Sequence, residues 1–522
     1  MCGLQTPVNN VWFTLLLHPL LTDLLVHHFV CYRKYGNFAV EFTKTGIFTM
    51  VYNSFNFIVI FSILFLLYYI IPPKHYQVRN LYLLIVSYFL YLQWKPAYAL
   101  ILLGITTITY YAARYIEEKS SYNNRTLISF NIIVALLPLL VFKYYNFLNE
   151  SISSFLASIG IQFHLAGLNW AIPVGISFFT FQAIGYVWDV YYQKQKAERN
   201  FLDYALFISF FPSIVSGPIN KASLVLPQIK QHRVFFDYPK AVQGLRFLLW
   251  GMFMKVVVAD RLALVVDVIY PHYNNYSSFS CLITSLFYTI QIYADFAGYS
   301  LMALGVGKLL GFELTENFRR PYFAVSVTDF WHRWHISLST WLKDYIYIPL
   351  GGSRCSKARN YWNIFVTFLV SGIWHGANWT FIVWGIWHGL FQIIEKALHQ
   401  QKCQYGAFGK TIKIAITFIL VNFAWIFFRM ETLTDAVNVI KKIVTMNSLT
   451  FDLKVSLTDG VLIAIALLCL FVKDFRDEFF PNKLRLFENP KRLIRWSSYI
   501  IIMMMILLCG VFDSSQFIYA YF

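Results

Sequence analysis

The chain has 522 residues, of which 58% are hydrophobic and only 13% are charged, and its mean hydropathy is +0.54. A soluble protein of this size cannot bury so much apolar surface, so the composition excludes a soluble globular fold and indicates a multi-pass membrane protein. The net charge of +17 does not indicate a nucleic-acid partner. The basic side chains lie in polar gaps between apolar runs, at 74–79, 194–199, 354–359 and 473–495, where the positive-inside rule and anionic membrane lipids favour them.

The first 49 residues differ from the rest of the chain. Their one weak apolar run, 11–30, is interrupted by Pro19, Asp23 and histidines, and it lacks the basic start and clean apolar core of a signal peptide. We expect residues 1–49 to be a wrongly assigned extension and Met50 to be the true start; the alternative is an interfacial or extra helix. N-terminal peptide mapping of the purified protein should find no peptide from upstream of Met50, and any such peptide would contradict this expectation.

Long apolar runs fill the remainder of the sequence. A bilayer-spanning helix needs about 20 apolar residues. Thirteen runs near that length begin around Phe55, Leu81, Tyr98, Leu127, Ile172, Tyr204, Val242, Leu282, Asn363, Phe381, Ile412, Gly460 and Ser498. They predict an all-α, polytopic membrane protein with roughly 11–13 transmembrane or re-entrant helices, some of them short or tilted. We expect one membrane domain, residues 50–522.

The stretch "ISFFPSIVSGPINKASLVLP" contains several helix breakers. Pro212, Gly217, Pro218 and Pro227 are incompatible with one regular helix. Irregular backbone at membrane depth persists only when it is buried in protein or lines a wet cavity. The pattern therefore predicts a re-entrant or kinked element beside a cavity, with an ordinary interfacial loop as the alternative.

The stretch "DFWHRWHISLSTWLKDYIYIPLGGSR", 329–354, carries two histidines. If 329–345 is one helix that turns about 100° per residue, His335 falls on the aromatic, buried stripe. His332 falls at the edge of this stripe, nearer the polar side. The pattern therefore predicts an amphipathic helix with one inward histidine.

Two more histidines lie in "SGIWHGANWTFIVWGIWHGL", 371–390, which contains the pentapeptide GIWHG twice. On one continuous helix, His375 and His388 are separated by about 20 Å of rise and about 220° of rotation, so they could not share one small site. Gly376 and Asn378 weaken the helix beside His375, which predicts a break that lines a cavity. His388 follows an aromatic run and is expected to be a packed histidine with a hydrogen-bond partner.

An inward histidine can act as a general base. An unperturbed imidazole has a pKa of about 6.5, so desolvation leaves it neutral and able to accept a proton. It can deprotonate a hydroxyl as that hydroxyl attacks an acyl carbonyl, while a second imidazole or an amide stabilises the oxyanion. His375 and His335 suit these two roles. The sequence lacks the G-x-S-x-G motif, so an acyl-serine route has no support.

A metal site is the less favoured hypothesis. His332, His335 and His375 could offer three nitrogens, but His332 points away from the predicted stripe and no H-E-x-x-H is present. The seven cysteines form no CxxC and no paired spacing. We therefore expect no metal cofactor.

Taken together, these segments resemble the membrane-bound O-acyltransferase (MBOAT) family. The resemblance is strongest to its bacterial branch, which contains the alginate O-acetylation membrane protein and the teichoic-acid D-alanyl transfer protein. The matching stretches, in chain order, are "IPVGISFFTFQAIGYVWDVY" (172–191), "FFPSIVSGPINK" (210–221), "YADFAGYSLMALGVGKLLGFELTENFRRPY" (293–322), 329–354, "GIWHGANWTFIVWGIWHG" (372–389) and "SSQFIYAYF" (514–522).

The resemblance implies a helical domain around a central funnel, with His375 as the catalytic histidine and His335 as the second histidine of the site. It implies acetyl-CoA as a cytosolic donor and an extracytoplasmic polysaccharide acceptor. It further implies a secreted or membrane-anchored polysaccharide acetyltransferase as partner, and a location in the bacterial inner membrane among its lipids. Relatives often carry another polar residue at the position of His332, and residues 1–49 have no recognised counterpart.

Two other functions remain open from the residues alone. A polysaccharide or lipid-linked substrate transporter or flippase could use the histidines as a proton relay, which inverted repeats would favour. The GIWHG duplication is direct and too short to count as such a repeat. A structural scaffold for an envelope synthase would predict that His375 is dispensable. The sequence names neither the acceptor polysaccharide nor the acyl group, although acetyl is favoured.

Overall fold

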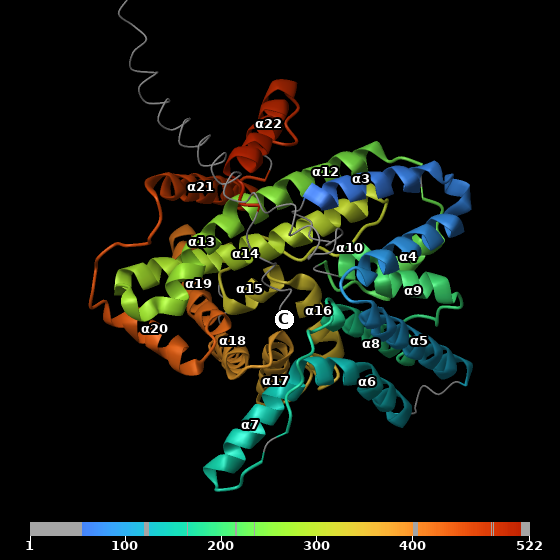
Figure 1. Ribbon diagram of the computed structural model, residues 1–522, viewed down its shortest axis with the longest axis horizontal. Coiled ribbons are helices and arrows are strands. Elements are labelled where there is room, and N and C mark those ends of the chain that lie inside the picture. The colour runs from blue at the N-terminus through green and yellow to red at the C-terminus, as the bar shows by residue number, and fades with distance from the viewer. Residues whose placement is uncertain are drawn as a thin grey trace, which may run out of the picture. The chain divides into compact units, whose positions relative to one another are not determined.

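The computed structural model describes residues 55–119, 125–163, 165–214, 217–233, 235–399, 406–481, 483 and 485–512 (Figure 1). All regular secondary structure within these ranges is helical, as the sequence predicts. The segment expected to be an N-terminal extension, 1–49, and the terminal stretch 514–522 lie outside the described residues. Each of the thirteen expected apolar runs overlaps a helix, and the run that begins at Tyr204 is divided between two short helices, α9 and α10.

The helices follow one another with few long connections. Their bounds are α3 (Phe55–Ile70), α4 (Tyr76–Leu92), α5 (Pro96–Glu118), α6 (Arg125–Leu139), α7 (Tyr145–Ser158), α8 (Ile176–Tyr191), α9 (Phe201–Ser209), α10 (Phe211–Ile214), α11 (Ala222–Lys230), α12 (Tyr238–Met252), α13 (Asp260–Ile269), α14 (Ser278–Leu309), α15 (Val327–Arg333), α16 (Ile336–Leu342), α17 (Lys357–His375), α18 (Trp379–Ala397), α19 (Ala407–Arg429), α20 (Leu433–Thr445), α21 (Leu457–Phe479) and α22 (Arg492–Cys509). Three π-helical segments continue helices without a break: η2 (Leu140–Tyr144), η3 (Phe253–Ala259) and η6 (Lys343–Tyr347).

Several helices are long and apolar enough to cross a membrane. Within the described residues these are α5, the continuous segment Arg125–Ser158, α19 and α22, together with the bent pair Phe57–Ile70 and Pro73–Leu92, whose halves meet at 105°. The protein is therefore an all-α polytopic membrane protein. The central helix α14 is buried along most of its length and packs on α12, α13, α19 and α20 (Figure 1).

The stretch 210–230 is broken, as its prolines and glycines predict. Helix α10 ends at Ile214, and α11 begins only at Ala222. Pro227 is an exception among the expected breakers, because it lies inside α11. Its ring still removes a backbone donor from that short helix.

One predicted continuous helix is wrong. The expected helix 329–345 is interrupted at Trp334 and His335, which separate α15 from α16. The chain is also broken after His375, as Gly376 and Asn378 predict, so the two GIWHG copies lie on two different helices, α17 and α18. The first break is imposed by long-range bonds: Arg319 N donates to Arg333 O (2.9 Å) and Ile336 N to Asn317 O (3.0 Å). A stripe of apolar residues carries no information about such bonds.

The two copies of GIWHG meet at their first glycines. A Cβ added to Gly372 would lie 2.4 Å from the carbonyl oxygen of Phe381 and 3.1 Å from the Cα of Gly385. A Cβ on Gly385 would lie 2.5 Å from the carbonyl oxygen of Phe368. Only glycine at both positions lets the backbones of α17 and α18 approach this closely.

Gly385→Ala should therefore separate α17 from α18. We expect a loss of about 1–3 kcal/mol in unfolding free energy, because neighbouring backbone cannot yield to the new methyl group. Gly104→Ala in α5 is the matched control, since nothing lies within 4 Å of the added Cβ, and it should not destabilise the protein. Thermal unfolding of both variants in detergent checks this; equal melting temperatures would contradict the packing argument.

Candidate active site

His335 and His375 come together in the interior. Both side chains are fully buried, and their ring centroids are 6.5 Å apart. His335 lies at the junction of α15 and α16, and His375 is the last residue of α17. The pair selected from the sequence thus forms one cluster, although the two histidines are 40 positions apart in the chain.

The backbone of His335 has an uncommon conformation for a residue with a side chain. Its φ of 42° and ψ of 54° lie in the left-handed region. For a residue other than glycine, this conformation costs about 1–2 kcal/mol. Asn317, itself fully buried, holds this turn: its carbonyl accepts Ile336 N (3.0 Å) and its Oδ1 accepts Ser337 N (3.3 Å). Strain that the surroundings enforce in this way recurs at functional sites.

Acidic side chains anchor helix α15 at both ends. Glu395 of α18 accepts hydrogen bonds from Val327 N (2.5 Å) and Thr328 N (3.0 Å) at its start, where a carboxylate matches the helix dipole. At its end, Arg333 bonds to Glu478 (2.8 Å). The helix before His335 is therefore fixed in place.

Aromatic rings surround the two histidines. His375 contacts Trp374 (centroids 4.8 Å apart), Trp384 (4.7 Å) and Phe428 (5.4 Å), and Phe296 contacts His335 edge-on at 4.7 Å. Such rings exclude bulk water and strengthen every electrostatic interaction in the site.

His388 lies on the other side of Trp384. Its ring centroid is 4.9 Å from that indole, and its Nδ1 accepts a hydrogen bond from Trp331 Nε1 (3.3 Å). The expected hydrogen-bond partner is therefore present. The calculated separation of His375 and His388 assumed one continuous helix. The chain is broken between them, and both histidines contact Trp384, so that calculated separation does not apply.

His332, the third histidine of the hypothetical metal site, does not lie with the other two. His332 is exposed, whereas His335 is fully buried. Within the described residues, no group of three or more His, Cys, Asp or Glu side chains is placed to hold a metal ion.

Lys143 and Tyr144 of η2 are neighbours of the site that the sequence analysis missed. Lys143 Nζ donates to the carbonyl of Trp374, and Tyr144 Oη donates to the carbonyl of Ile373 (2.7 Å). The only indication in the sequence was a lysine inside a long apolar run. A search for apolar runs of membrane-spanning length does not single out one such residue.

A cavity of about 250 Å³ lies next to the histidine cluster. Residues 219–224 of the broken element line it, so the predicted position beside a cavity is confirmed. Ser337, two residues after His335, also lines it, and the stacked rings of Phe181 and Trp341 (3.8 Å) form another part of its wall. At the mouth, Lys221 pairs with Asp344.

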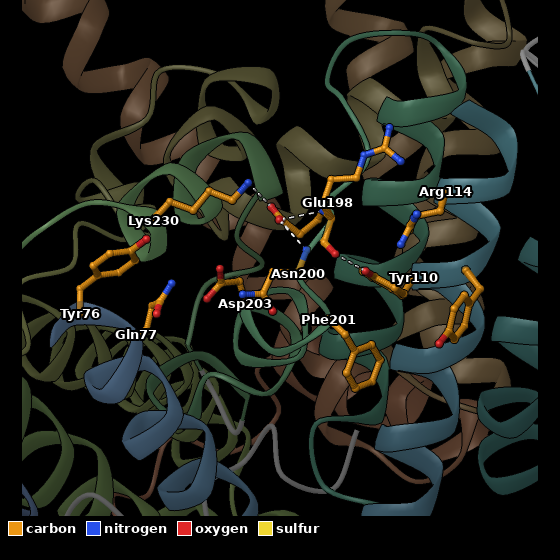
Figure 2. Close-up of a pocket in the computed structure, with 11 residues that line it drawn as sticks. Tyr76, Gln77, Tyr110, Arg114, Glu198, Asn200, Phe201, Asp203 and Lys230 are labelled. Atoms are coloured by element: carbon orange, nitrogen blue, oxygen red, sulfur yellow. Dashed lines mark hydrogen bonds and ion pairs between the residues drawn. The ribbon is translucent and has the colours of Figure 1, made fainter. Parts of the chain in front are cut away.

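Neither His335 nor His375 lines this cavity, and neither lines two larger hollows. Figure 2 shows one of about 590 Å³, in which Lys230 points to Glu198 across the groove at 2.7 Å. Its other lining residues include Tyr76, Tyr110 and Asp203. Another, of about 550 Å³, lies between α12, α14 and α21. Charged side chains that pair with one another line part of it, among apolar and aromatic residues. Volume alone therefore does not locate the chemistry.

The fold and this cluster define a class: polytopic helical membrane proteins with a buried pair of histidines at helix ends. The sequence pattern of the MBOAT, membrane-bound O-acyltransferase family, matches residues 192–433, a range that includes His335 and His375. Relatives that are 35–39% identical over 74–77% of the chain show that the chain belongs to this family and is an O-acyltransferase.

Curated relatives are similar over most of the chain. The probable alginate O-acetylase AlgI of Pseudomonas syringae pv. tomato is 39% identical over 74% of this chain and 73% of its own length. The peptidoglycan O-acetyltransferase of Helicobacter pylori is 35% identical over 77% of this chain and 81% of its own length. The teichoic acid D-alanyltransferase of Bacillus subtilis is 25% identical over 62% of this chain and 82% of its own length.

Proposed function

We propose that this protein transfers an acetyl group from cytosolic acetyl-CoA to an extracytoplasmic polysaccharide, directly or through a secreted or membrane-anchored acetyltransferase. Relatives named for alginate and peptidoglycan O-acetylation support acetyl as the acyl group and a polysaccharide as the acceptor. The activity is assigned to the membrane domain 50–522, and its proposed location is the bacterial inner membrane.

The observation that carries the proposal is the buried pair of imidazoles with centroids 6.5 Å apart. This separation suits an acyl carbonyl placed between the two rings. His375 accepts the proton of the acceptor hydroxyl as its oxygen attacks the thioester carbon, a contribution of about 10²–10⁴-fold in rate. An N–H of His335 donates to the oxyanion.

The balance of the reaction is simple. The new C–O ester bond forms, the C–S bond of the thioester breaks, and the proton held by His375 passes to the leaving thiolate. Thus the histidine returns to its neutral form in each cycle, and no metal or covalent acyl-enzyme is required.

The cavity beside Ser337 is the donor route in this proposal. Hydroxyl and amide side chains line it, among them Gln182, Ser223 and Thr340, and these can bond the amides of an extended pantetheine arm. Lys221 at its mouth suits the phosphate end of the arm.

Three alanine variants test the assignment in cells. At matched membrane levels, His375→Ala should reduce polysaccharide O-acetyl content at least about 100-fold, because the general base is lost. His335→Ala should also abolish acetylation. His388→Ala should retain most of it, because the contacts of His388 are aromatic packing and one hydrogen bond from Trp331, which are structural.

A wild-type level of O-acetyl groups in cells that express His375→Ala would contradict the proposed mechanism. The transporter hypothesis would then be favoured. Equal losses for His375→Ala and His388→Ala would instead contradict the division of roles between the two GIWHG copies.

A further inference from the structure

Lys143 is a charged residue in an unusual place. It lies in η2, inside the 34-residue apolar segment Arg125–Ser158, and only 7% of its surface is exposed. Burying a lysine inside a membrane segment is costly, and such residues are generally retained for function. The acyl transfer described above does not account for it.

The contacts of Lys143 lead directly to His375. Its ammonium donates to the carbonyl of Trp374 and lies 5.6 Å from the centroid of the Trp374 indole. Tyr144, the next residue, donates to the carbonyl of Ile373 (2.7 Å). Two consecutive side chains of η2 thus bind two consecutive carbonyls immediately before His375.

These carbonyls belong to a helix end that needs partners. The last four carbonyls of a helix have no intrahelical donor, and α17 ends at His375. Inside a membrane protein such groups must be satisfied by other parts of the protein. The π-helical turn of η2 presents both donors to this end, and π-bulges are frequent at functional sites.

A neutral donor such as the Tyr144 hydroxyl is sufficient to satisfy a carbonyl. The ammonium of Lys143 adds a positive charge where the dipole of α17 places a partial negative charge. That partial charge favours a protonated imidazole at the helix end, and a protonated imidazole cannot act as a base. The titratable side chains that face His375 are Lys143 from η2, His335 from the α15–α16 junction and His388 from α18.

We propose that Lys143 is a positioning residue for His375: its ammonium holds the Trp374 carbonyl, fixes the last turn of α17 and offsets the helix dipole at the base. This inference rests on the proposed function, because it assigns Lys143 to the reaction in which His375 is the base. Lys143 itself need not touch the acyl group.

Kinetics of the purified full-length protein in lipid nanodiscs test the inference. The acetyl-CoA-dependent transfer rate is measured for Lys143→Met, Lys143→Gln and Lys143→Arg, with His375→Ala as reference. We expect Met and Gln to lower kcat about 10- to 100-fold with little change in KM for acetyl-CoA, because misplacing a catalytic group slows the chemical step. Arg, which keeps the charge and donor, should restore a large part of kcat. Lys410→Met, which removes an exposed lysine from α19, is the matched control and should behave as wild type.

Melting temperatures separate positioning from a structural role. Lys143→Gln keeps an amide donor for the Trp374 carbonyl, so it should melt near wild type while kcat falls. Lys143→Met removes that donor and should melt somewhat lower, because a buried carbonyl that loses its donor is destabilising. Wild-type kcat in Lys143→Met or Lys143→Gln overturns the inference. So does a parallel loss of folding and activity in both variants, or a failure of Arg to restore kcat. Full activity of His375→Ala would instead refute the proposed function itself.

Discussion

The contact between the first glycines of the two GIWHG copies is the constraint on which the site depends. Gly372 and Gly385 carry no side chains, so α17 and α18 approach backbone to backbone. This contact places Trp384 of α18 against His375 at the end of α17, with His388 on the other side of the same indole. The duplicated pentapeptide is therefore a packing motif that also delivers one histidine to the cluster.

Both histidines of the cluster occupy breaks in helices. His375 ends α17, and His335 adopts a left-handed conformation between α15 and α16. Breaks expose backbone groups, and in a membrane protein each such group needs a partner from the protein. Asn317 provides partners at His335, and η2 provides them before His375. The polar residues around the site thus form hydrogen bonds with the backbone at the two breaks. By fixing the backbone there, they determine where the imidazoles lie.

The sequence predicts those features that depend on composition and local chemistry. Apolar run lengths predict the helical membrane fold, and Gly376 with Asn378 predicts the break after His375. The predicted burial of His335 is confirmed. The cause is not an apolar stripe on a continuous helix, because hydrogen bonds to residues 317–319 interrupt the helix at His335. Periodicity cannot reveal long-range bonds of this kind. For the same reason it missed Lys143, whose partner carbonyl is 231 positions away.

A structure of the His375→Ala variant with bound, unreacted acetyl-CoA would test the central claim most directly. The account predicts that the thioester carbonyl lies within hydrogen-bonding distance of His335 and faces the space vacated at position 375, with the pantetheine arm in the cavity lined by Ser337 and Lys221. An ordered donor whose thioester lies far from both positions, for example in the charged hollow between α12, α14 and α21, would contradict it.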